Sequence, residues 1–164
     1  MRLKLGFLLL LTACSSLPEK GLTTLHKEEV YALEHLPCAS VASKTPWEKR
    51  DYSFLCNMGE WGTITYILYP DEDKNDGSIQ RAKLMWKEYV SNDFFPSNKQ
   101  YVESVLNRLA TQFAPNHQKR VVGFASTVSP YTFYTDYLKV KHETEYYKNT
   151  PEPYFLHKVW FINQ

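Results

Sequence analysis

The stretch that decides the fold is "TITYILY", residues 63–69, which is rich in β-branched and aromatic side chains. It is apolar at both odd and even positions, a pattern typical of a strand covered on both faces in the middle of a sheet. A second run of this kind, Tyr52–Met58, precedes it, and the residues between them, Gly59 to Gly62, begin and end with glycine. The pattern predicts a β-hairpin whose second strand is central rather than at an edge.

Apolar residues recur at helical spacing in three segments outside this hairpin: 22–36, 79–90 and 102–113. Ser78 is a suitable N-cap for the second segment. Ser97 and Gln100 match a capping box at the start of a helix that contains the third. We expect its apolar stripe to face the core, because helices must pack on something, although such a stripe can also bind a partner.

The C-terminal part of the chain is rich in strand-forming residues. We expect strands at 120–128, 131–147 and 154–162, with a turn at 148–153. Helices and strands are segregated along the chain rather than alternating regularly. This order predicts an α+β domain with a mostly antiparallel sheet and about three helices packed on one face.

The N-terminus has the layout of an export signal. Arg2 and Lys4 precede a short apolar run, Leu5 to Leu11, which is far below the roughly 20 residues that a membrane-spanning helix needs. The residues Leu11-Thr12-Ala13-Cys14 then resemble the lipobox of bacterial lipoproteins. The alternatives are an ordinary signal peptide or an uncleaved apolar N-terminus.

The resemblance implies cleavage before Cys14 and attachment of lipid to its thiol and new N-terminus, with acyl chains such as palmitate. Because Ser15 rather than Asp follows the cysteine, it also implies the outer membrane, facing the periplasm or the cell surface. We therefore expect a signal peptide at 1–13, a lipidated N-terminus and tether at 14–21, and a single domain at 22–164.

Composition narrows the class of protein further. Residues 14–164 carry 17 basic and 18 acidic side chains and no long basic block, so we expect no nucleic-acid partner. With Cys14 assigned to lipid, Cys38 and Cys56 remain as an even pair in an exported chain, which predicts a disulfide. Closing this loop should stabilise the fold by roughly 3 kcal/mol. Two free thiols or a partial metal site are the alternatives.

Two groups of residues could carry chemistry. Asp71, Asp73 and Asn75 alternate as the first ligands of a calcium loop would, but Asp76 occupies the required glycine position, so a solvated turn is the preferred interpretation. His142 and His157 could meet if the last two strands form a hairpin. They and Asp136 are the first residues to consider for catalysis, but no catalytic, metal or cofactor motif surrounds them.

Aromatic residues are dense near the C-terminus. Tyr131, Phe133 and Tyr137 share the parity of Lys139 and Lys141, which places them on the more polar side of an expected continuous strand. Tyrosine beside lysine suits a contact surface, so these three aromatic residues form a possible binding face. Packing inside the fold is the competing interpretation.

These observations together favour a membrane-anchored envelope lipoprotein with a non-catalytic role. We expect it to bind another envelope or exported protein, as an assembly factor, inhibitor or immunity protein, and we expect no cofactor. The alternative is an envelope hydrolase acting on peptidoglycan or lipid.

Overall fold

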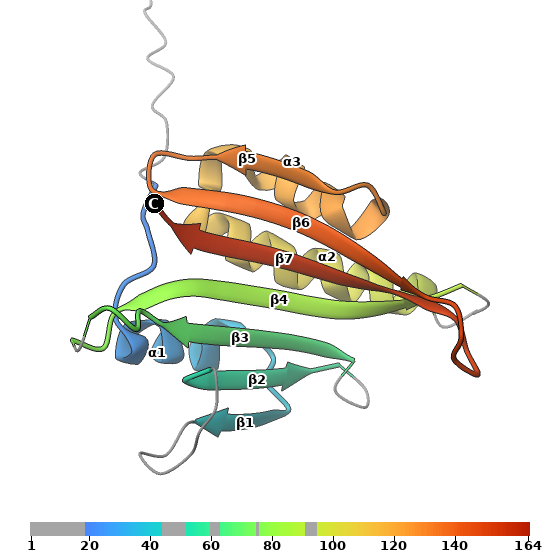
Figure 1. Cartoon of the computed structure of the whole chain (residues 1–164), viewed down its shortest axis with the longest axis horizontal. Helices are drawn as coiled ribbons and strands as arrows, with labels where there is room; N and C mark the ends of the chain where they lie inside the picture. The colour runs from blue at the N-terminus through green and yellow to red at the C-terminus, as the bar shows by residue number, and fades with distance from the viewer. Residues whose placement is uncertain (1–18, 44–51, 60–62, 75, 91–94) are drawn as a thin grey trace, which may run out of the picture.

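The computed structural model describes residues 19–43, 52–59, 63–74, 76–90 and 95–164, with the backbone alone at 95–98 (Figure 1). Within these residues seven strands form one antiparallel sheet in the order β1-β2-β3-β4-β7-β6-β5. The strands are β1 (Ser40–Ser43), β2 (Phe54–Met58), β3 (Ile64–Pro70), β4 (Ile79–Tyr89), β5 (Tyr131–Tyr134), β6 (Leu138–Tyr147) and β7 (Tyr154–Asn163). The α-helices are α1 (Leu25–His35), α2 (Phe95–Phe113) and α3 (Gln118–Val122).

The predicted hairpin is confirmed and sits inside the sheet. β3 pairs with β2 on one side and with β4 on the other, so Tyr66 lies between Cys56 and Leu84. Gly59, at the end of β2, has a φ of 72°, a conformation that glycine adopts without steric cost. The residues 60–62 of this turn lie outside the described part of the chain.

All three α-helices lie on the same side of the sheet, behind the strands in Figure 1. The core forms between them and the strand residues that alternate toward this side, such as Cys56, Tyr66, Leu84 and Val159. From α2 the core receives the stripe that the sequence predicted. Its members are all buried: Val102, Val105, Leu106, Leu109, Ala110 and Phe113. The expected α+β class, with helices on one face, is confirmed.

A disulfide links the segment after α1 to the second strand. Cys38 and Cys56 are bonded, with their Cα atoms 5.3 Å apart. The prediction of this pair is confirmed. The bond holds the region around α1 against β2 on the helix side of the sheet, where Cys56 is fully buried.

Three local predictions are wrong. Residues 79–90 form strand β4, not a helix, because β3 and β7 pair with it on both sides. Residues 120–128 are mainly helical, since Val121, Phe124 and Ala125 recur at helical spacing and are all buried. The expected continuous strand 131–147 is broken by a turn at 135–137 into β5 and β6, which pair with each other. A short strand, β1, was not predicted.

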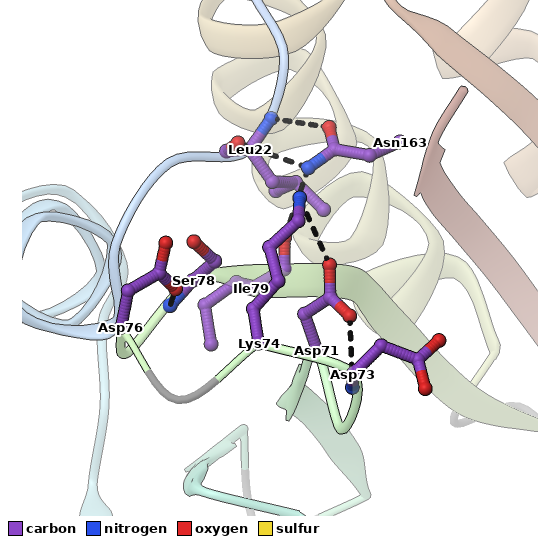
Figure 2. A network of polar contacts seen from close by, with 8 residues as sticks. All are labelled: Leu22, Asp71, Asp73, Lys74, Asp76, Ser78, Ile79 and Asn163. Carbon is purple, nitrogen blue, oxygen red and sulfur yellow. Dashed lines mark hydrogen bonds and ion pairs between the residues drawn. The ribbon is translucent and has the colours of Figure 1, made fainter.

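The two ends of the described chain are joined beside β4. Asn163 accepts a hydrogen bond from Leu22 N (2.8 Å) and donates to the carbonyl oxygens of Leu22 (3.0 Å) and Ile79 (2.9 Å), as Figure 2 shows. This contact fixes where the N-terminal segment leaves the domain. Among the described residues, none of the helices has the length and apolar character required to cross a bilayer.

Candidate functional site

The most distinctive surface of the domain is the side of the sheet that faces away from the helices, which we call the open face. Strand residues alternate, so those next to the core residues point to this side. Following the register across the sheet, the open face includes Leu55, Asn57, Thr65, Ile67, Tyr69, Arg81, Lys83, Met85, Lys87, Tyr89, Lys139, Lys141, Glu143, Glu145, Tyr147, Tyr154, Leu156, Lys158, Trp160 and Ile162. Ser40 and Ala42 of β1 and Thr132 and Tyr134 of β5 point to the same side.

Positive charge is concentrated on the open face. It carries six cationic side chains, Arg81, Lys83, Lys87, Lys139, Lys141 and Lys158, and two carboxylates, Glu143 and Glu145. The whole chain has a formal net charge of only +1, so this excess is a local property of one surface. The potential of such a surface attracts and orients an acidic partner.

Aromatic rings hold the central cations in place. The rings of Tyr69 and Trp160 lie 5.8 Å apart between their centroids. The guanidinium of Arg81 lies 4.7 Å from the Tyr69 centroid, and the ammonium of Lys83 lies 4.7 Å from that of Trp160. Trp160 also donates a hydrogen bond from Nε1 to Glu143 (2.8 Å). These cation–π contacts order long side chains that would otherwise lose entropy on binding.

The cations of the open face fall into two groups. Lys141 and Lys158 form ion pairs of 2.5 Å with Glu143 and Glu145, and these contacts lower the pKa of both carboxyl groups. Arg81, Lys83, Lys87 and Lys139 have no carboxylate at ion-pair distance in the part of the chain that the structure describes. Burial lowers the pKa of Lys83, and the nearby charges of Lys158 and Arg81 lower it further. An acidic ligand would relieve this crowding.

The two predicted histidines do meet, but inside the core. His142 and His157 are fully buried, and His142 Nε2 lies 3.2 Å from His157 Nδ1. Beyond them, His142 Nδ1 lies 3.2 Å from Ser129 O, and His157 Nε2 lies 2.6 Å from Glu88 Oε2. These contacts form a chain of three hydrogen bonds from Glu88 to Ser129.

Counting protons assigns the donors in this chain. The carbonyl of Ser129 only accepts, so His142 Nδ1 donates to it, and His142 Nε2 then accepts from His157 Nδ1. The contact between His157 Nε2 and Glu88 Oε2 needs one further proton, which either the carboxyl or the imidazole can hold. Burial raises the pKa of Glu88 and lowers the pKa of both histidines to about 4, which favours a protonated carboxyl and two neutral imidazoles.

The hydrogen-bonded histidines give no support to the alternative function, a hydrolase. Trp86 stacks on His157 with centroids 4.6 Å apart, and Phe124 stacks on His142 at 4.8 Å, so described side chains enclose the rings. Asp136 does not join them. It is exposed in the turn between β5 and β6, where its N–H donates to Glu19 (3.2 Å).

The acidic segment after β3 is a turn between two strands rather than the predicted turn into a helix. As Figure 2 shows, Asp71 pairs with Lys74 (3.2 Å) and accepts from Asp73 N (3.3 Å), while Asp76 accepts from Ser78 N (2.9 Å). Asn75 lies outside the described residues. No group of three His, Cys, Asp or Glu residues in the described ranges is arranged to hold a metal ion.

The predicted aromatic binding face needs a correction. Phe133 is buried against His117 and Phe124, and Tyr131 points to the same side of the sheet, because both pair with helix-facing residues of β6. The parity argument assumed one continuous strand, and the turn before Leu138 breaks it. Tyr131 and Tyr137 are nevertheless exposed, as is Tyr134, which the parity argument left out.

Sequence reasoning missed the open face itself. Its signal was the alternation of Arg81, Lys83 and Lys87 along a segment that was assigned to a helix. Cys14, the predicted lipidation site, lies outside the described residues. No family model, curated protein or solved structure matches this chain. The chemistry of the open face is therefore the main observation that bears on function.

Proposed function

We propose that this protein is a membrane-anchored envelope lipoprotein whose domain binds the acidic surface of a partner protein on the open face, without catalysing a reaction. The observation that carries the proposal is the ordered group of Arg81 and Lys83 over Tyr69 and Trp160. The disulfide between Cys38 and Cys56 is consistent with an exported protein. The lipobox ending at Cys14 supports the anchor.

A protein partner suits the composition of this surface. Arginine, tyrosine and tryptophan are the residues most enriched where binding energy concentrates in protein interfaces. Trp160 is half-buried, so a partner can cover the rest of its ring, and the unpaired cations around it select for carboxylates. The surface is one side of a continuous sheet, and this shape suits another folded domain.

The test is crosslinking in intact cells, followed by recovery of the tagged full-length protein. We expect a partner to be recovered with the wild-type protein and lost when Arg81→Glu and Lys83→Glu are combined. A purified pair should also bind more weakly as salt increases, because exposed charges are screened within about 10 Å at 0.1 M ionic strength.

The matched control is Lys27→Glu with Lys148→Glu, which makes the same change in charge at exposed sites outside the open face. Lys87→Glu is a milder variant on the open face, for the case in which the central pair affects folding. Thermal unfolding of each variant shows whether it is folded. A partner retained by folded open-face variants, or lost equally from the control, would contradict the proposed site.

A further inference from the structure

Exposed aromatic side chains gather along the strand at one edge of the sheet. Tyr131, Tyr134 and Tyr137 expose 46%, 60% and 52% of their surface. They belong to β5 and the turn that follows it, and β5 ends the strand order of the described sheet. We call these three tyrosines, with Lys119, Arg120 and Lys139 beside them, the β5 edge.

Basic side chains accompany these tyrosines. The Arg120 guanidinium lies 5.7 Å from the centroid of Tyr131, and Lys139 pairs with Tyr134 across the sheet. Lys119 and Arg120 are both exposed on α3. A surface of exposed tyrosine and lysine or arginine is the composition that proteins place at the boundary between water and lipid headgroups.

The N-terminal segment reaches the domain at this same edge. The carboxylate of Glu19 accepts hydrogen bonds from Asn116 Nδ2 (3.1 Å) and from Asp136 N (3.2 Å). Two residues further along, a Cβ built on Gly21 would lie 3.5 Å from Tyr137 Cβ. The turn that carries Tyr137 therefore contacts the first described residues of the chain, which follow the expected lipid anchor at Cys14 in the sequence.

Only five residue steps separate Cys14 from Glu19. Even a fully extended chain covers no more than about 18 Å over that distance. A lipid on Cys14 would hold the β5 edge close to the headgroups, so the domain could not move far from the bilayer.

We propose that the β5 edge is the surface with which the anchored domain rests on the membrane, with its tyrosines at headgroup level and its cations on anionic lipids. This inference rests on the proposed lipid anchor. Seated in this way, the domain points β1 away from the bilayer. Lys139 lies where the β5 edge meets the open face, and the other cations of the open face stay clear for a partner.

The experiment uses the full-length lipidated protein in vesicles of phosphatidylethanolamine and phosphatidylglycerol. A single cysteine replaces Tyr134 (Tyr134→Cys) and carries an environment-sensitive fluorophore. The matched control is Tyr146→Cys, a tyrosine of similar exposure (52%) at the opposite end of β6. We expect the emission at position 134 to shift to the blue and to be quenched by brominated lipids, and the emission at position 146 to do neither.

Flotation of the vesicles distinguishes a failure of the lipid anchor from a failure of the proposed contact between the β5 edge and the membrane. Protein that does not float would overturn the anchor and this inference together, but not partner binding by the open face. Protein that floats with both labels equally exposed to water would overturn the inference and leave the anchor intact. A label at position 134 that is shielded but not quenched by lipid would mean that a second protein covers the edge, and it would also overturn the inference.

Discussion

His142 and His157 are fully buried between the rings of Phe124 and Trp86. Ionisable side chains are rarely buried without partners, and here the hydrogen bonds from Glu88 to Ser129 satisfy both imidazoles in their neutral forms. A second proton on His142 Nε2 would face the N–H of His157 instead of an acceptor, and a second proton on His157 Nε2 would require an ionised Glu88 carboxylate as its acceptor. Burial disfavours these charged imidazoles, so the stability of the fold should depend on pH.

The free energy of unfolding should fall as pH decreases from 6.5 to about 4. Burial lowers the pKa of both histidines from 6.5 to about 4, so in this range the unfolded chain binds protons that the folded chain excludes. Glu88 acts in the opposite sense, because burial raises its pKa and its contribution is lost as pH rises. It offsets part of the effect, and a net loss on the order of a few kcal/mol remains.

Urea denaturation of the unlipidated Cys14→Ala form at a series of pH values measures this dependence. His142→Phe removes one of the two titrating groups and should flatten the curve, even if it also lowers stability at pH 7. His26→Gln changes an exposed histidine and should leave the shape unchanged. Equal slopes in all three proteins would show that the buried pair does not control the pH dependence.

Contacts between residues could be predicted from the sequence where they depend on residue counts or on strands that follow each other in the chain. The even cysteine count in a chain expected to be exported predicted Cys38 with Cys56, and the expected final hairpin brought His142 near His157. Glu88 was missed because its partner comes from a distant strand. Phe133 was misplaced because a turn of three residues changed the parity on which its assignment relied.

At the scale of elements, β4 shows what local sequence cannot decide. Ile79, Ala82, Met85 and Trp86 recur at helical spacing, yet Ala82, Leu84 and Trp86 also alternate as a strand requires. Pairing with β3 and β7 on either side decides between the two patterns, and these pairings are non-local. The helix α2 had no such ambiguity, because its stripe runs through three turns without alternation.

Removing packing from α2 should therefore cost the fold much of its stability. Leu106 is fully buried between the helix and the sheet, so Leu106→Ala should lower the free energy of unfolding by about 2–5 kcal/mol. Leu33→Ala makes the same chemical change on α1 at a side chain that is 55% exposed, and it should cost less than about 0.5 kcal/mol. Denaturation by urea compares them, and similar losses would mean that the α2 stripe is not the main core contact.

At the scale of the whole molecule, the two sides of the sheet differ in the polarity and charge of their side chains. Its helix side is mainly apolar, with Glu28 and the histidine chain among its buried polar groups, and its other side carries ordered cations. The strand order puts the β5 edge, which meets the N-terminal segment, at one end of the sheet and β1 at the other. The α+β class could be predicted from the sequence, but the open face could not, because it is assembled from strands far apart in the chain.

If the open face binds an acidic surface, removing one of its own carboxylates should strengthen binding. Glu143 pairs with Lys141, so Glu143→Gln would free this cation for a partner while keeping an acceptor for Trp160 Nε1. We expect affinity to rise roughly two- to fivefold, the scale of an exposed ion pair. Glu152→Gln removes the same charge from the exposed turn after β6 and should have little effect. Calorimetric titration of the purified partner measures both. Because Arg81→Glu should act in the opposite direction, a loss of affinity in Glu143→Gln would show that shape rather than charge governs recognition here.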